Sequence, residues 1–208
     1  ATMAFSADTG VSNSDLNTTT AAQTISGTTN TNLVTGEIVE VSIDNGSSWN
    51  TATTNVGTNT WSLAGVTLTA SNTLKVRVSD VAGNNGTTAS QAYLLNTAAP
   101  TTTIATSAFS ADTGTSGTDF NTKTAAQTIS GTTSADLVKD EMVQVSIDNG
   151  STWTTATTSL GANTWSLAGV TLTASDTLKM RVSDTAGNNG TASSQVYVLD
   201  TSAPTKTI

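Results

Sequence analysis

Apolar and polar residues alternate along several short segments of the chain, the pattern of a half-buried β-strand. The segments 39–43 and 74–78 carry Val, Ile or Leu at every second position, with Glu, Ser, Lys or Arg between them. Shorter apolar runs predict further strands at Gln23–Thr28, Trp61–Leu68 and Ser90–Leu95. Asp44–Gly46 predicts a tight turn, because Asn-Gly accepts positive φ angles, and Trp49 restarts a strand behind it. No segment shows the spacing of an amphipathic helix.

The same pattern is written twice, at an offset of 104 residues. Residues 1–104 align with 105–208 without a gap, and 76 of the 104 positions are identical. Pro100 and Pro204 occupy the same phase of the repeat, and we interpret Asn96–Pro100 as a short linker, since proline cannot continue a central strand. The predicted domains are therefore 1–98, 99–203, and a start of a following repeat at 204–208.

The fold prediction follows from the strand count. With Thr101–Phe109 as the first strand of the second repeat, each repeat holds about seven short strands, the number typical of an immunoglobulin-like sandwich. Threonine, a β-former, supplies 47 of the 208 residues. We expect an all-β protein of two tandem immunoglobulin-like β-sandwich domains arranged end to end. The first strand of repeat one is incomplete, because Ala1 aligns with Ala105 and Thr101–Ile104 have no counterpart.

Composition excludes several classes of function. The chain has no Cys and no His, so Ser-His-Asp triads, Cys-His dyads and Cys/His zinc sites are excluded. Fifteen acidic residues against seven basic ones give a net charge of −8, which argues against nucleic-acid binding. No apolar run approaches the about 18 residues of a membrane span. We expect a monomer that is not an enzyme and does not insert into a membrane.

Two motifs invite other interpretations. Asp-Thr-Gly occurs at Asp8 and Asp112, as in the two lobes of aspartic proteases, but each triplet follows Ser-Ala instead of an apolar strand. The four tryptophans, at 49, 61, 153 and 165, are either core residues or a platform on which sugars stack. The sequence leaves this second question open.

Acidic residues gather in the predicted loops. In an up-and-down sandwich, the loop after the first strand and the end of the last strand lie at one end, and the loops near Glu37 and Asp80 lie at the other. Clustered carboxylates repel unless a cation lies among them, and Ca²⁺ takes six to eight oxygen ligands. We therefore expect Ca²⁺ in the loops and, with Asn96 facing the second repeat, at the inter-domain junction. Alternatively, each Asp forms only its own turn. The predicted ligands are Asp8, Asp15, Glu37, Asp80, Asn96, Asp112, Asp119, Asp136, Asp140, Glu141, Asp184 and Asp200.

The order of motifs resembles a known family. Asp-Thr-Gly-x-Ser-x-x-Asp at 8–15 and 112–119 is followed by Ile-Ser-Gly-Thr at 25–28, Val-Ser-Ile-Asp-Asn-Gly at 41–46, Asp-x-Ala-Gly-Asn at 80–84 and Asp-Thr-x-Ala-Pro at 200–204. This resembles the bacterial Ig-like repeats in the extender regions of giant RTX adhesins of the ice-binding and biofilm type. One position departs from the pattern: Asn96 stands where the second repeat has Asp200.

The resemblance implies a calcium-rigidified spacer on the bacterial cell surface. Its partners would be neighbouring repeats of the same chain, and the adhesive target would bind elsewhere in the parent protein. The alternative is a carbohydrate- or protein-binding β-sandwich module of a secreted protein.

Overall fold

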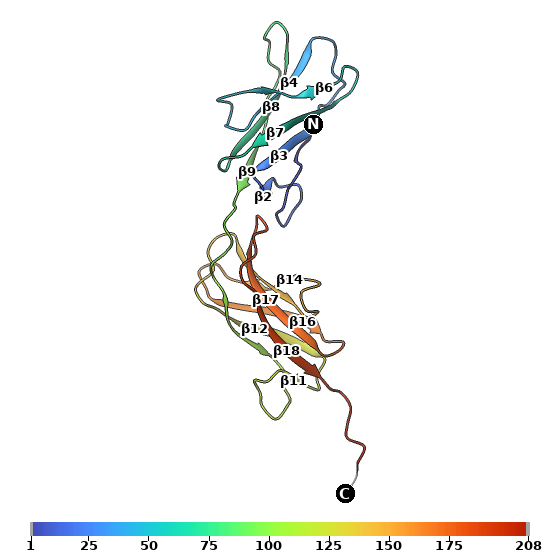
Figure 1. Cartoon of the computed structure of the whole chain (residues 1–208), viewed down its shortest axis with the longest axis vertical. Helices are drawn as coiled ribbons and strands as arrows, with labels where there is room; N and C mark the ends of the chain where they lie inside the picture. The colour runs from blue at the N-terminus through green and yellow to red at the C-terminus, as the bar shows by residue number, and fades with distance from the viewer. Residues whose placement is uncertain (1, 207–208) are drawn as a thin grey trace. The chain divides into compact units, whose positions relative to one another are not determined.

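The computed structural model describes residues 2–206 and places no helix among them. The strands form two compact units, with the chain's main division between Ala98 and Ala99 (Figure 1). Residues 207 and 208, part of the predicted start of a following repeat, lie outside the described residues.

The first unit is a sandwich of two sheets. Strands β1–β3–β7–β6 form the four-stranded sheet and β2–β9–β8–β4–β5 form the five-stranded one. Every pairing is antiparallel except that of β2 with β9. The bounds are β1 Thr2–Phe5, β2 Asn17–Thr18, β3 Ala22–Thr28, β4 Glu37–Ser42, β5 Asn50–Thr51, β6 Thr53–Thr54, β7 Thr60–Thr67, β8 Asn72–Asp80 and β9 Ala89–Leu95.

The second unit repeats this topology. Its sheets have the orders β10–β12–β16–β15 and β11–β18–β17–β13–β14, again with one parallel pair, β11 with β18. The predicted pair of immunoglobulin-like sandwiches is confirmed. The bounds are β10 Ile104–Phe109, β11 Asn121–Thr122, β12 Ala126–Thr133, β13 Glu141–Ser146, β14 Thr154–Thr155, β15 Thr157–Thr158, β16 Thr164–Thr171, β17 Asp176–Asp184 and β18 Ser193–Leu199.

Each sandwich encloses its own core. In the first unit Ile25, Val39, Val41 and Leu74 are fully buried at alternate positions of their strands, as the sequence pattern predicts. The second core contains the matching residues but is larger at two places. Phe120 replaces Leu16 and Met180 replaces Val76.

Three details differ from or refine the predicted strand map. The strand expected to restart at Trp49 begins one residue later and is short: β5 covers Asn50–Thr51, and β6 follows it. The Trp49 ring itself lies against the Arg77 guanidinium, 4.0 Å from the ring centroid. The segment Trp61–Leu68 also carries Gly65, where the sequence suggests a break; β7 runs through this glycine, but a β-bulge shifts its register with β3 there. The first strand of the second unit begins at Ile104 and not at Thr101. The Asn-Gly turn is confirmed, with φ of 61° at Asn45 and 93° at Gly46.

Candidate functional site

The loop after the first strand folds back around one core residue in each unit. Leu16 and Phe120 have positive φ angles of 60° and 62°, and both side chains are buried. The backbone N–H of Leu16 donates to Asp8 Oδ2 at 3.0 Å, and that of Phe120 donates to Asp112 Oδ2 at 2.9 Å. In each loop, the aspartate near the start therefore accepts a hydrogen bond from the backbone near the end.

The second aspartate of each loop lies in the same turn. Asp15 Oδ1 accepts from Asn17 N at 3.0 Å, and Asp119 Oδ1 accepts from Asn121 N at 3.1 Å. In the first unit, burial raises the pKa of Asp8, and the charge of Asp15 raises it further, while the Leu16 N–H opposes both. The loop thus holds two neighbouring acids, one of which is partly desolvated.

One carboxylate oxygen in each loop has no hydrogen-bond partner. Asp8 Oδ1 and Asp112 Oδ1 are buried, and neither accepts a hydrogen bond from the described residues. A buried polar atom without a partner is costly, about 1–3 kcal/mol. The same unsatisfied atom occurs at the same position in both copies, so a cation at these oxygens fits the donor set.

A buried glutamine side chain forms hydrogen bonds with the backbone of each loop. Gln23 Oε1 accepts from Ala7 N at 3.0 Å, while its Nε2 donates to the carbonyls of Ala7 and Thr20 at 3.0 and 2.8 Å. Gln127 makes the same bonds in the second unit. The sequence prediction missed this residue. The available signal was an amide at an inward position of β3, two residues before the buried Ile25.

The opposite end of each sandwich places two acids across a strand pair. Glu37 of β4 lies opposite Asp80 of β8, and Glu141 of β13 lies opposite Asp184 of β17. The loops of the first unit also meet here, since Val81 N donates to the Gly36 carbonyl at 3.0 Å. This is the juxtaposition that the alternation of strands predicts.

These acids also serve their own turns. Glu37 Oε2 accepts from Val34 N at 2.9 Å, and Glu141 Oε2 accepts from Val138 N at 3.1 Å. Asp80 Oδ1 accepts from two backbone N–H groups, and its pKa is lowered chiefly by the Asn84 side chain, which donates at 2.8 Å. For Asp80, the turn-forming interpretation is therefore satisfied by the structure.

The remaining predicted ligands are more dispersed. Asp136 and Asp140 are exposed in the loop before β13, and Asp140 has a φ of 72°. Asn96 Oδ1 accepts from Ala98 N and Asp200 Oδ1 accepts from Ser202 N, both within local turns. Between residues 2 and 206, no three acidic side chains come together in a group that could hold a metal ion. The junction site therefore stays a prediction.

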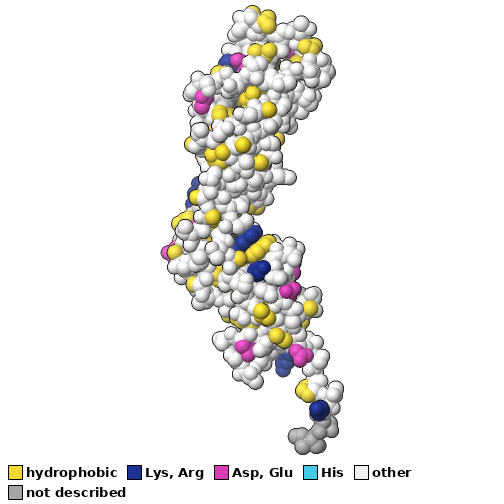
Figure 2. Space-filling view, viewed as in Figure 1, with side chains coloured by type: hydrophobic (Ala, Val, Ile, Leu, Met, Phe, Trp, Pro, Cys, Tyr) yellow, Lys and Arg dark blue, Asp and Glu magenta, His cyan; other side chains and the backbone are white. Residues whose placement is uncertain are grey.

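The tryptophans separate into two kinds. Trp61 and Trp165 are buried in the cores. Trp49 and Trp153 are half-buried, and Arg77 and Arg181 lie over their rings at 4.0 and 3.9 Å. On the face drawn in Figure 2, charged side chains are sparse among neutral polar surface. Among the described residues, no helix is long and apolar enough to cross a membrane.

Comparison with known proteins gives structural matches alone. No family model and no curated protein matches the chain. One similar solved structure is a tetra-tandem repeat in the extending region of a large adhesion protein, at 22% identity and a TM-score of 0.31, matched over 96% of this chain and 49% of that one. The chain thus spans about half the length of that structure.

Two other similar structures are a set of fibronectin(III)-like modules and a domain of a biofilm-associated protein. The fibronectin(III)-like modules of Clostridium thermocellum CbhA match at 12% identity and a TM-score of 0.50, over 95% of this chain and 93% of theirs. The BSP domain of a biofilm-associated protein matches at 15% identity and a TM-score of 0.28, over 90% of this chain and 29% of that one. Together with the sheet topology, the match to the CbhA modules shows two tandem domains of the immunoglobulin and fibronectin-III type of β-sandwich.

Proposed function

We propose that the chain is a pair of structural spacer repeats from a large bacterial surface adhesin, stabilised by Ca²⁺ bound in the loops after β1 and β10. The observation that carries the calcium proposal is the unpaired, buried carboxylate oxygen that recurs at Asp8 and Asp112. The two copies are identical at 76 of 104 positions, which fits a spacer, because repeats that only add length need no differences in sequence.

The loop offers the ligand chemistry that Ca²⁺ prefers. Asp8 and Asp15, or Asp112 and Asp119, would supply carboxylate oxygens, and the loop's carbonyl, hydroxyl and amide oxygens would complete a shell of six to eight. Bound Ca²⁺ would neutralise the adjacent charges and give the orphaned oxygen a partner. At 100 times its dissociation constant, an ion that binds only the folded state adds about 2.7 kcal/mol per site.

The extracellular setting is part of the proposal. A fold that needs calcium for full stability would be less stable in a calcium-poor cytosol than outside the cell, where calcium reaches millimolar levels. Its partners would be the neighbouring repeats of the parent chain. The competing function, a carbohydrate-binding module, needs an open indole face, but Trp61 and Trp165 are buried and arginines cover one face of Trp49 and Trp153.

The test compares thermal unfolding in EGTA, in CaCl₂ and in MgCl₂. We expect the melting temperature to rise with Ca²⁺ and not with Mg²⁺, and we expect Asp112→Ala with Asp119→Ala to reduce that rise. Asp176→Asn is the matched control: it installs the residue found at position 72, and both side chains accept from the next backbone N–H. Identical melts in Ca²⁺ and EGTA would remove calcium from the proposal.

A further inference from the structure

The Asn-Gly turn between β4 and β5 recurs between β13 and β14, as Asn45–Gly46 and Asn149–Gly150. Asparagine before glycine is open to deamidation, because glycine has no side chain to hinder the reaction. The glycine nitrogen attacks the asparagine Cγ and gives up its proton, the bond from Cγ to the side-chain nitrogen breaks, and ammonia leaves. Water then opens the succinimide ring to aspartate or isoaspartate, so the two steps together hydrolyse one amide.

The backbone conformation of this turn keeps the reacting atoms apart. The φ angles are 61° at Asn45 and 55° at Asn149. For a residue with a side chain, such angles mean the left-handed conformation, with ψ of about 47°. At that ψ the glycine nitrogen lies nearly opposite Cβ about the Cα–C bond, whereas the succinimide ring requires the two atoms to be almost eclipsed. Deamidation therefore requires a large rotation about this bond.

A buried serine hydroxyl opposes the rotation. Ser42 is fully buried at the end of β4, and its Oγ accepts from Gly46 N at 2.7 Å and donates to Asp44 Oδ1 at 2.7 Å. On the other side of the rotating bond, Asn45 N donates to the Thr73 carbonyl at 3.1 Å. In the second unit the corresponding three bonds measure 2.8, 2.6 and 3.0 Å. Rotation would therefore break a hydrogen bond on a backbone that is fixed from both ends.

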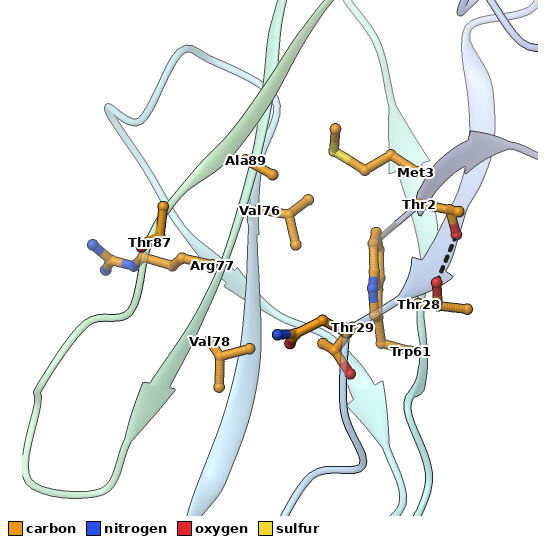
Figure 3. A pocket seen from close by; sticks show the side chains of 11 residues that line it. Thr2, Met3, Thr28, Thr29, Trp61, Val76, Arg77, Val78, Thr87 and Ala89 are labelled. Carbon is orange, nitrogen blue, oxygen red and sulfur yellow. Dashed lines mark hydrogen bonds between the residues drawn. The ribbon is translucent and has the colours of Figure 1, made fainter.

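Side chains on the outer face of the five-stranded sheet flank the glycine. A Cβ at Gly46 would lie 3.6 Å from Lys75 Cδ and 3.7 Å from Trp49 Cζ2. The Trp49 ring is itself packed against Arg77, and Figure 3, a view into a small pocket of the first unit, shows Arg77 directed away from the buried Val76. These side chains limit access of water and base to the glycine nitrogen.

We propose that Ser42, by accepting from Gly46 N, protects Asn45 from deamidation. Ser146 has the same role in the second unit. The turn needs two positive φ angles and therefore favours Asn-Gly, and the serine suppresses the reaction to which this pair is open. Isoaspartate at position 45 would lengthen the main chain by one carbon and add a negative charge next to Asp44, which would disturb the pairing of β4 with β5. Ser42 is thus a positioning residue that preserves the turn chemically.

The experiment follows deamidation of the folded full chain at mildly alkaline pH, by peptide mapping with mass spectrometry. A synthetic peptide of residues 41–49 gives the rate without the fold. We expect Asn45 to react at least about tenfold more slowly in the chain than in this peptide. Ser42→Ala removes both hydroxyl bonds and should raise the rate at Asn45 by about tenfold, while Asn149 keeps its rate. Ser146→Ala should have the converse effect.

Ser79→Ala is the matched control, because Ser79 is also buried and its hydroxyl also donates to a carboxylate, Glu40 Oε2 at 2.7 Å, away from the turn. It should leave the rate at Asn45 unchanged. All rates are compared at a temperature at which circular dichroism shows each variant to be folded. Three results would each overturn the proposal: equal rates in the chain and the peptide, an unchanged rate in Ser42→Ala, or the same increase in Ser79→Ala. None of these results bears on the calcium-dependent melts.

Discussion

Replacing Gln127 by alanine should destabilise the second unit, because this buried amide completes the backbone hydrogen bonds of the Asp112 loop. Gln127 is 3% exposed, and its side chain bonds Ala111 N, Ala111 O and Thr124 O at 3.0, 3.0 and 2.8 Å. The Ala111 carbonyl would keep the Thr122 hydroxyl as a donor. Ala111 N would lose its glutamine partner, and Thr124 O would keep the long contact with the Thr122 hydroxyl, at 3.5 Å.

The expected magnitude follows from these two groups. Each buried polar group left without a partner costs about 1–3 kcal/mol, so two such groups should lower the free energy of unfolding by about 2–6 kcal/mol. For a domain of this size, each kcal/mol lowers the melting temperature by about 4–8 °C. The variant should also show a smaller calcium-dependent rise, because Ala111 immediately precedes Asp112.

Urea unfolding gives the free energy, and amide hydrogen exchange at Ala111 N gives the local effect. Gln195→Ala is the control, since its exposed Nε2 donates to the carbonyl of the neighbouring Val196. The first unit, with Gln23 intact, is a second control within the same molecule. A loss below about 0.5 kcal/mol, the level of an ordinary surface substitution, would refute the argument. Unchanged exchange at Ala111 would refute it as well.

Three other substitutions test separate parts of the fold. The Ser79 hydroxyl and then Arg77 lower the pKa of Glu40, so the stability that the Glu40 carboxylate adds is present above about pH 4.5 and is lost as the pH falls through the lowered pKa. Glu40→Gln should therefore make the first unit's melting temperature fall less between pH 7 and pH 3. An equal fall in the variant and the original chain would contradict this. Gly131→Ala should lower the second unit's melting temperature by more than about 10 °C, because a Cβ there would overlap the Thr106 carbonyl. A shift within the error of calorimetry would show that β10 can move away from β12 at little cost. Hydroxyl donors lower the pKa of Asp148 from 3.8 to about 2, so Asp148→Asn should lower the melting temperature at pH 7 and much less at pH 2; equal losses at both values would assign the effect to packing.

The sandwich itself is predictable from the sequence for clear physical reasons. Alternation at 39–43 and 74–78 identifies the central strands, since one-sided burial requires a period of two. Asn45-Gly46 identifies the turn, because few other pairs tolerate two positive φ angles. The 104-residue repeat then supplies the second unit.

The candidate site is less predictable because it depends on how the loop closes. The spacing of Asp8 and Asp15 indicates a pair of acids, but nothing in it indicates that Leu16 adopts a positive φ and receives Asp8 Oδ2. The unpaired Oδ1 is a consequence of that closure. Likewise, Trp49 and Trp61 look alike in sequence, and only the packing places one beneath an arginine and the other in the core.

The two unequal cores bear on how such similar neighbours avoid exchanging strands while they fold. Tandem domains of high identity are prone to misassembly, in which a strand of one domain completes the other. Here the first core contains Leu16 and Val76 where the second contains Phe120 and Met180. A strand exchanged between the units would carry a side chain of another size into either core, which leaves a void where it is smaller and overfills the core where it is larger. The difference in side-chain size therefore makes sandwiches with exchanged strands less stable than those in which each unit keeps its own strands.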